Sequence, residues 1–315
     1  PLRLQTRRTV PPTAISTALR PHPERAAPVP PGRMFAIQYG LILSCLLSSI
    51  TGLAGVLDTP GTMVRFFGPN YPTAAILMWN FKMQFGSLLS VYALNVVVAV
   101  YAPLTTLAYV LACMNLIRVG YVMQYLVSAE KMALMGFMEN GKMLKVIIAV
   151  QTVLAAVIAG CAYSSSLDPE YIAYAAAITP APLGSYAYFV YFLCAVGILG
   201  RTPAVLNPIK VQKRFMAEGK SLPSDKGELL QLEFVLGFIA INFLQIWAFV
   251  LGLSFVVPTV TPIAGFITVI CGVFIPVMAK TILGIDELGF ATLPVLFFLI
   301  IISVMFGASF LTLLA

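Results

Sequence analysis

Eight hydrophobic stretches, separated by more polar segments, run along most of the chain. A helix of about 20 apolar residues crosses a hydrocarbon layer of ~30 Å, because each residue adds about 1.5 Å. Most of the stretches reach this length, so the sequence predicts an all-α, polytopic membrane protein with about eight transmembrane helices. The fifth is short, unless residues 171–182 add a half-helix that breaks at Pro180 and Pro182. The expected spans are residues 35–57, 74–101, 103–127, 143–162, 184–199, 229–257, 263–283 and 291–314.

Two similar stretches suggest that these spans are organised as an internal duplication. Residues 55–64 read GVLDTPGTMV and residues 197–206 read GILGRTPAVL, and three further spans follow each of them. In each half a tight proline turn, at Pro103 and at Pro258, joins two long spans and predicts an antiparallel hairpin. Because four spans are an even number, both copies enter the membrane in the same direction. We therefore expect an extension at 1–33 and two parallel four-helix units at 34–165 and 166–315.

Hydrophobic residues make up 60% of the 315 residues and charged residues only 10%, which leaves too little polar surface for a soluble protein of this size. The charges between the spans are distributed unevenly. The loops after the first, third, fifth and seventh spans carry nearly all the Lys and Arg, and the positive-inside rule places these loops on the side from which the chain was inserted. Examples are Arg65, Lys131, Lys142, Arg201, Lys210, Lys213, Arg214, Lys220 and Lys226.

The first 33 residues form a basic segment that is rich in Pro and Arg and contains one acidic residue, Glu24. This composition cannot bury an apolar core, so the segment alone is expected to be disordered. It is typical of the end of an organellar transit peptide, which points to the mitochondrial inner membrane or the plastid thylakoid. We expect a neighbouring subunit to hold this tail through basic residues, among them Arg3, Arg7, Arg8 and Arg20.

Residues that carry redox or metal chemistry are scarce. His22 is the only histidine of the chain, and the five cysteines stand singly in five spans without a CxxC pair. These features exclude bis-histidine haem ligation, di-iron histidine clusters and most zinc sites, so no haem or metal is expected. Phosphate-binding loops and nucleophile motifs are also missing, and the chain is not expected to be an enzyme. Bound lipids are expected, and a pigment is an alternative that needs an amide, carboxylate or water ligand.

Polar residues inside two of the spans recur at helical spacing. One such stripe lies on span 74–101 and the other on span 229–257, and these spans are counterparts in the repeat. The stripes either line a substrate cavity between the two halves or form interhelical hydrogen bonds, each worth about 0.6–2 kcal/mol. The candidate cavity residues are Asn80, Gln84, Asn95, Glu233, Asn242 and Gln245.

Arg118 lies more than halfway along span 103–127, where an isolated charge costs several kcal/mol. It must therefore meet a carboxylate, a lipid phosphate or a neighbouring subunit, or else extend its side chain to the interface. Lys82 is nearer the end of its helix and can reach the interface. Lys280 lies at the exit of span 263–283, near Asp286 and Glu287, in an expected interfacial ion-pair group. These three basic residues are the candidate anchors for lipids or partners.

The segment from Asn80 to Tyr125 resembles the DoxX-like four-helix membrane proteins. The resemblance rests on Gly86 in a helix with small residues, on the corner at Pro103 and on Arg118 in the following helix, and it covers only part of the chain. That family includes small accessory subunits of oxidase complexes, which is the role that the resemblance implies. The duplicated unit and the Pro/Arg-rich tail depart from the family pattern.

The transit-like tail, the aromatic-rich helices and the lack of catalytic residues favour an accessory, non-catalytic subunit of a large organellar respiratory or photosynthetic complex. Such a subunit binds other membrane subunits and lipids, and no nucleic acid. The alternative is a secondary transporter for a small solute or lipid, with its site between the two halves. A pigment- or quinone-binding subunit, with Phe and Tyr faces as walls, is a third hypothesis.

Overall fold

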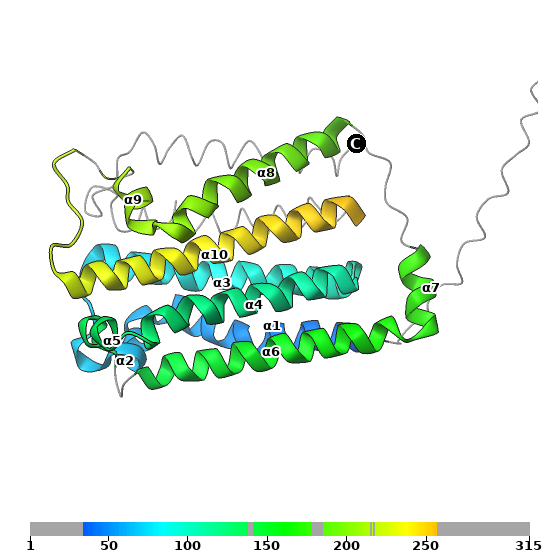
Figure 1. Ribbon diagram of the computed structural model, residues 1–315, viewed down its shortest axis with the longest axis horizontal. Coiled ribbons are helices and arrows are strands. Elements are labelled where there is room, and N and C mark those ends of the chain that lie inside the picture. The colour runs from blue at the N-terminus through cyan, green and yellow to red at the C-terminus, as the bar shows by residue number, and fades with distance from the viewer. Residues whose placement is uncertain (1–33, 138–140, 178–184, 215, 217, 257–315) are drawn as a thin grey trace, which may run out of the picture. The chain divides into compact units, whose positions relative to one another are not determined.

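The computed structural model describes residues 34–137, 141–177, 185–214, 216 and 218–256, and every element in this part of the chain is a helix (Figure 1). The prediction of an all-α protein is confirmed for these residues. In chain order the helices are α1 (Ala36–Leu57), α2 (Thr59–Phe67), the 3-10 helix η1 (Gly68–Asn70), α3 (Ala75–Tyr101), α4 (Thr105–Leu126), α5 (Ala129–Met135), α6 (Lys142–Ser166), α7 (Pro169–Ala177), α8 (Ser185–Leu206), α9 (Pro208–Lys213) and α10 (Lys226–Val256).

Five of the described helices, α1, α3, α4, α6 and α10, are long and apolar enough to cross a membrane. They correspond to the predicted spans 35–57, 74–101, 103–127, 143–162 and 229–257. Helix α8 covers the predicted fifth span and continues to Leu206, although its apolar stretch, Cys194–Leu206, is shorter. The predicted spans 263–283 and 291–314, Lys280 and the tail 1–33 lie outside the described residues. The described helices therefore have the length and composition of an integral membrane protein.

The five long helices form a closed ring in which each helix packs against two neighbours. Helix α3 lies between α1 and α10, α4 lies between α6 and α10, and α1 packs against α6, while α8 packs against α10 outside the ring (Figure 1). The proline turn at residues 102–104 joins α3 to α4, yet these two helices do not pack along each other as the predicted hairpin requires. Large side chains from both helices, among them Tyr92 and Arg118, are buried and line a cavity that the helices enclose.

The segments α1–α2–α3 and α8–α9–α10 are built alike. In each, a long helix ends at a residue with similar backbone angles, φ −133° and ψ 76° at Asp58 and φ −148° and ψ 74° at Asn207. Both side chains cap the short helix that follows, since Asp58 Oδ1 accepts from Gly61 N at 2.9 Å and Asn207 Oδ1 accepts from Lys210 N at 3.1 Å. When the two similar stretches are aligned, Asp58 falls opposite Gly200. The residue that has the structural position of Asp58 in the second segment is Asn207, seven residues after Gly200. The two breaks are thus alike in geometry but differ in register by about two helical turns.

The short helices give the two ends of the ring different charges. Helices α2, α5 and α9 lie at the same end in Figure 1, and they carry basic residues such as Arg65, Lys131 and Lys213. Helix α7 lies at the opposite end, where Asp168 precedes it and Glu170 is in its first turn. The basic segments that follow the first, third and fifth predicted spans therefore gather on one side, which is the arrangement that the positive-inside rule describes.

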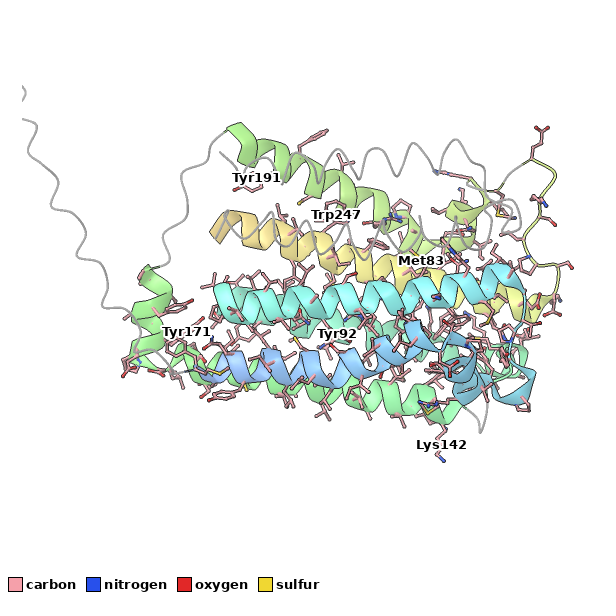
Figure 2. All side chains as sticks on the ribbon, turned by 180° about the vertical axis from the view of Figure 1, so that it is seen from behind. Met83, Tyr92, Lys142, Tyr171, Tyr191 and Trp247 are labelled. Atoms are coloured by element: carbon pink, nitrogen blue, oxygen red, sulfur yellow. The ribbon has the colours of Figure 1, made fainter. Side chains whose placement is uncertain are left out.

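Tyr171 attaches α7 to the turn between α3 and α4, far from the basic end (Figure 2). The Tyr171 hydroxyl donates to the Pro103 carbonyl oxygen at 2.9 Å and accepts from Thr105 N at 3.0 Å. Its ring packs edge-on against Phe35, with ring centroids 5.3 Å apart. Burial raises the pKa of the Tyr171 phenol above its usual value, so the neutral form that donates to Pro103 is favoured.

Replacing Tyr171 with Phe should lower the free energy of unfolding by about 1–3 kcal/mol, because Pro103 O and Thr105 N lose their partner. In the wild type, the neutral phenol contributes its full stabilisation below the unfolded-state pKa of about 10, and this contribution falls as pH rises through the raised folded-state pKa. The free energy of unfolding in detergent, measured from neutral to alkaline pH, should therefore decline less in Tyr171→Phe than in the wild type. An equal alkaline decline in both proteins would contradict this role of Tyr171.

Candidate functional site

Arg118 of α4 lies at the centre of a buried polar network. Its side chain is 1% exposed, and its guanidinium donates to the amide oxygens of three residues. Nε and Nη2 donate to Asn242 Oδ1 at 3.2 and 3.0 Å, and Nη1 donates to Asn115 Oδ1 at 2.9 Å. Nη2 also donates to Gln245 Oε1. Because Asn242 and Gln245 belong to α10, the network joins α4 to a helix that lies more than a hundred residues further along the chain.

The same network continues from α10 to α3. Asn242 Nδ2 donates to Ser87 Oγ at 2.9 Å, and Ser87 Oγ donates in turn to the Gln84 backbone oxygen at 2.8 Å. Both Ser87 and Asn242 are buried. Apolar surroundings strengthen such hydrogen bonds, and a buried group that loses its partner has no bulk water to replace it. One chain of hydrogen bonds therefore connects α4, α10 and α3 inside the ring.

The network satisfies most of the donors of Arg118 but does not neutralise its charge. Of the five N–H groups of the guanidinium, four donate to the amides of Asn115, Asn242 and Gln245, which leaves one N–H on Nη1. All these acceptors are neutral, and no carboxylate of the described residues hydrogen-bonds to Arg118. Burial of a charge with neutral partners alone is costly. Arg118 is therefore a group at which an anion would be stabilised.

Three other predicted cavity residues have separate surroundings. Asn80 Nδ2 donates to the Ile76 backbone oxygen of its own helix at 2.7 Å. Glu233 Oε1 accepts from Tyr125 Oη at 3.4 Å, in the first half of α10. Asn95 is fully buried, and within the part of the chain that the structure describes neither atom of its amide has a hydrogen-bond partner. Equal spacing along a helix thus did not bring these side chains together.

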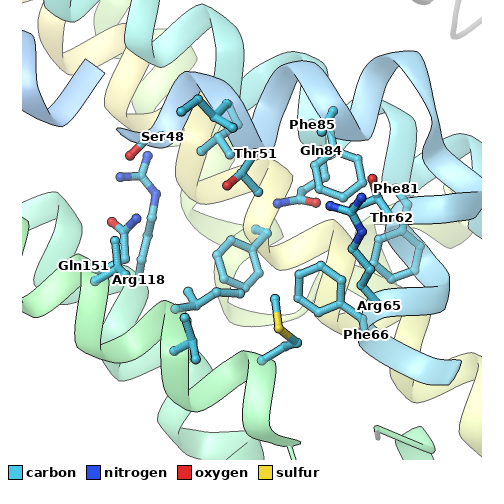
Figure 3. Close-up of a pocket in the computed structure, with 18 of the residues that line it drawn as sticks. Ser48, Thr51, Thr62, Arg65, Phe66, Phe81, Gln84, Phe85, Arg118 and Gln151 are labelled. Carbon is cyan, nitrogen blue, oxygen red and sulfur yellow. The ribbon is translucent and has the colours of Figure 1, made fainter. Parts of the chain in front are cut away.

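A cavity of about 250 Å³ lies between α1, α2, α3 and α6, and Arg118 reaches it from α4 (Figure 3). Gln84 is the predicted cavity residue that lines it. The predicted anchor Lys82 does not line the cavity and is exposed on α3. Aromatic and aliphatic side chains form most of the wall, including Leu47, Phe66, Phe81, Phe85, Leu88 and Ile147.

Two polar groups at the Arg118 end of the cavity were not predicted from the sequence. Ser48 of α1 and Gln151 of α6 line the cavity together with Arg118, and Figure 3 shows the three side chains at one end of it. Ser48 shares a helix face with Ser44. Two serines on one face do not by themselves indicate a binding site, because small hydroxyl residues are common at helix contacts in membranes. The contact of Asn115 with Arg118 could have been predicted from the sequence, because residues three positions apart are neighbours on a helix. Nothing in the sequence marks Gln151.

No family model, curated protein or solved structure matches the chain. The resemblance to the DoxX-like proteins therefore stays a prediction. Among the residues that the structure describes, no three His, Cys, Asp or Glu side chains form a group that could hold a metal ion. The described part of the chain is thus a bundle of helices of membrane-spanning length, and the groups there that hydrogen-bond to the buried Arg118 are neutral amides.

Proposed function

We propose that the protein is a non-catalytic, accessory subunit of a larger membrane assembly in an organelle, where its role is structural. The observation that carries this proposal is the network around Arg118. It places polar side chains of α4, α10 and α3 in hydrogen bonds between helices, and such bonds stabilise one packing arrangement. The proposed architecture is the pair of parallel four-helix units expected from the repeat, and the similar geometry at Asp58 and Asn207 supports it.

The outer faces of the described spans supply a surface for lipids and for other subunits. In a bilayer, exposed apolar positions contact acyl chains or neighbouring transmembrane helices. The tail 1–33 is the proposed contact with a partner subunit, and its transit-like composition supports an organellar location. The exposed apolar positions include Leu43, Leu46, Leu47, Ile50, Leu53 and Leu57 on α1 and Val146, Val150 and Val153 on α6.

Replacing Arg3, Arg7, Arg8 and Arg20 with Ala should release the protein from its assembly, because the proposed contact depends on these positive charges. The protein is expressed behind an unrelated cleavable import signal, so that its delivery does not depend on the tail. Carbonate extraction establishes membrane insertion, and native gel electrophoresis of mild detergent extracts reports the size of the assembly. A variant with Lys at the same four positions keeps the charge and should stay in the assembly. Unchanged co-migration of the Ala variant would count against the proposal.

A secondary transporter for a small solute or lipid is the second candidate, and the cavity beside Gln84 is the observation that favours it. The predicted carrier site between the two halves corresponds to the contact of α3 with α10. At that contact the hydrogen bonds among Ser87, Asn242 and Arg118 occupy polar groups that a solute would need. Solute uptake by proteoliposomes that contain the purified chain distinguishes the two proposals.

A further inference from the structure

The cavity beside Arg118 opens sideways, toward the surface that faces the bilayer. Helices α1 and α6 are in close contact near Gly40, where an added Cβ would lie 3.0 Å from the Cβ of Cys161. Further along these helices the cavity lies between them, lined by Leu47 and Ile50 of α1 and by Val150 of α6. These three side chains are also exposed on the outer surface. A molecule dissolved in the acyl-chain layer can therefore enter between α1 and α6.

Two hydrogen-bond donors that the described residues leave unused, one on Arg118 and one on Ser48, meet at the inner end of the cavity (Figure 3). Arg118 has one N–H on Nη1 for a further acceptor, and the described residues that hydrogen-bond to its charge do so through amides. Ser48 is 6% exposed, and its Oγ meets no hydrogen-bond partner at bonding geometry among the described residues, although the Tyr92 phenol lies beside it on the cavity wall. Gln151 Oε1 lies beside the same phenol, and as an acceptor it does not bond to a carboxylate. A buried hydrogen bond that is left unmade costs about 1–3 kcal/mol, so a ligand that supplies the missing partner gains affinity.

The chemistry and the size of the cavity define the class of ligand. No carboxylate of the described residues pairs with the buried charge of Arg118, so this end of the cavity favours an anion. The wall beyond it, formed by residues such as Phe66, Phe81 and Phe85, requires an apolar chain. The volume of about 250 Å³ is slightly below the ~300–1,000 Å³ of pockets that hold drug-sized ligands, so the cavity has room for a head group and part of one hydrocarbon chain, and the rest of the chain extends through the opening between α1 and α6.

We propose that this cavity binds a long-chain fatty acid, with its carboxylate at Arg118 and Ser48 and its acyl chain directed toward the opening between α1 and α6. One carboxylate oxygen accepts the free N–H of Arg118, and the other accepts the hydroxyl of Ser48. The bond to Arg118 is charge-assisted and forms in a low-dielectric environment, where it is stronger than in water. Gln151 borders the carboxylate from the side of α6.

The test measures equilibrium binding of radiolabelled palmitate to the full chain, purified in an uncharged detergent and washed free of lipid. Palmitate should bind saturably. Hexadecanol has the same chain without the charge and should bind at least about tenfold more weakly, because it cannot pair with Arg118. Acetate has the carboxylate without the chain and should not compete. The isolated chain suffices for this measurement, so it is independent of the proposed assembly.

Two pairs of variants test whether palmitate binds in the cavity, and they leave the residues of the Arg118 network unchanged. Ser48→Ala removes one hydrogen bond to the carboxylate and should weaken palmitate binding about tenfold. Ser44→Ala is its matched control, because Ser44 is also buried on α1 and without a partner among the described residues but does not line the cavity. Val150→Trp narrows the opening and should abolish binding, whereas Val153→Trp changes an exposed position of α6 outside the cavity.

Several results would overturn the proposal. Absence of saturable palmitate binding would mean that the cavity takes no fatty acid. Equal affinity for palmitate and hexadecanol would show that Arg118 does not pair with the head group. Equal binding by the Ser48→Ala and Ser44→Ala proteins, or by the Val150→Trp and Val153→Trp proteins, would place the bound fatty acid elsewhere on the protein.

Discussion

Replacing Asn242 with Leu should lower the free energy of unfolding by about 3 kcal/mol. Asn242 Oδ1 accepts from two nitrogens of Arg118, so its loss leaves a buried charge with fewer partners. Ser87 Oγ loses its donor in the same change. The measurement is equilibrium unfolding of the purified protein in mixed detergent micelles, followed by circular dichroism.

Asn95→Leu is the matched control for this substitution. Asn95 is as fully buried as Asn242, but among the described residues its amide has no hydrogen-bond partner. Removal of an unpartnered amide should leave the stability unchanged or raise it. In the double variant Arg118→Met/Asn242→Leu no buried charge remains at this site, so the loss should be smaller than the sum of the two single losses. Equal effects of Asn242→Leu and Asn95→Leu would show that the network does not stabilise the fold.

Gly55→Ala and Gly197→Ala should each lower the free energy of unfolding by about 1–3 kcal/mol, because close helix packing leaves no room for a methyl group. An added Cβ at Gly55 would overlap the ring of Phe85 on α3, and one at Gly197 would overlap the ring of Trp247 on α10. Figure 2 shows Trp247 on the side of α10 that faces α8. The same unfolding assay in micelles measures both variants.

Gly160→Ala is the control, because an added Cβ there meets no atom within 4 Å. This substitution should raise the stability by up to about 1 kcal/mol, the difference in helix propensity between the two residues. If the clash with Phe85 is the cause of the loss in Gly55→Ala, then Phe85→Leu should recover part of it in the double variant. Equal stability changes in Gly55→Ala and Gly160→Ala would contradict the close packing of α1 against α3.

Close packing at these two glycines gives a physical reason for the similarity of the two stretches at their first residue. Gly55 and Gly197 are the first residues of the two similar stretches, and each packs against an aromatic ring of the long helix that follows. The repeat could be detected from the sequence because each glycine and the residues that resemble each other around it are contiguous. The aromatic ring that each glycine contacts could not be predicted from the repeat. Phe85 lies 30 residues after Gly55 (85 − 55), whereas Trp247 lies 50 residues after Gly197 (247 − 197).

The polar stripe of α3 shows the limit of an argument from helical spacing. Asn80 bonds to its own helix, Gln84 lines the cavity, Ser87 accepts from Asn242, and Asn95 has no partner among the described residues. Spacing determines which residues share a face of a helix. It does not determine which neighbour covers each part of that face, and here α1, α10 and the cavity border different parts of α3.

The pattern of apolar residues was enough to predict that the described chain is helical and which residues form its long apolar helices. The physical reason is local, because in a bilayer every backbone N–H and C=O must be bonded within the segment, so a long apolar stretch must be a helix. It also identified Arg118 as a charge inside a span that must meet a carboxylate, a lipid phosphate or a neighbouring subunit or else extend to the interface, whereas in the structure it is buried and donates to amides of its own chain. The identity of these amides depends on how the helices pack, since Arg118 meets Asn242 across a separation of 124 residues. The ring of five helices, in which α10 lies between α3 and α4, brings these side chains together and leaves the cavity open between α1 and α6.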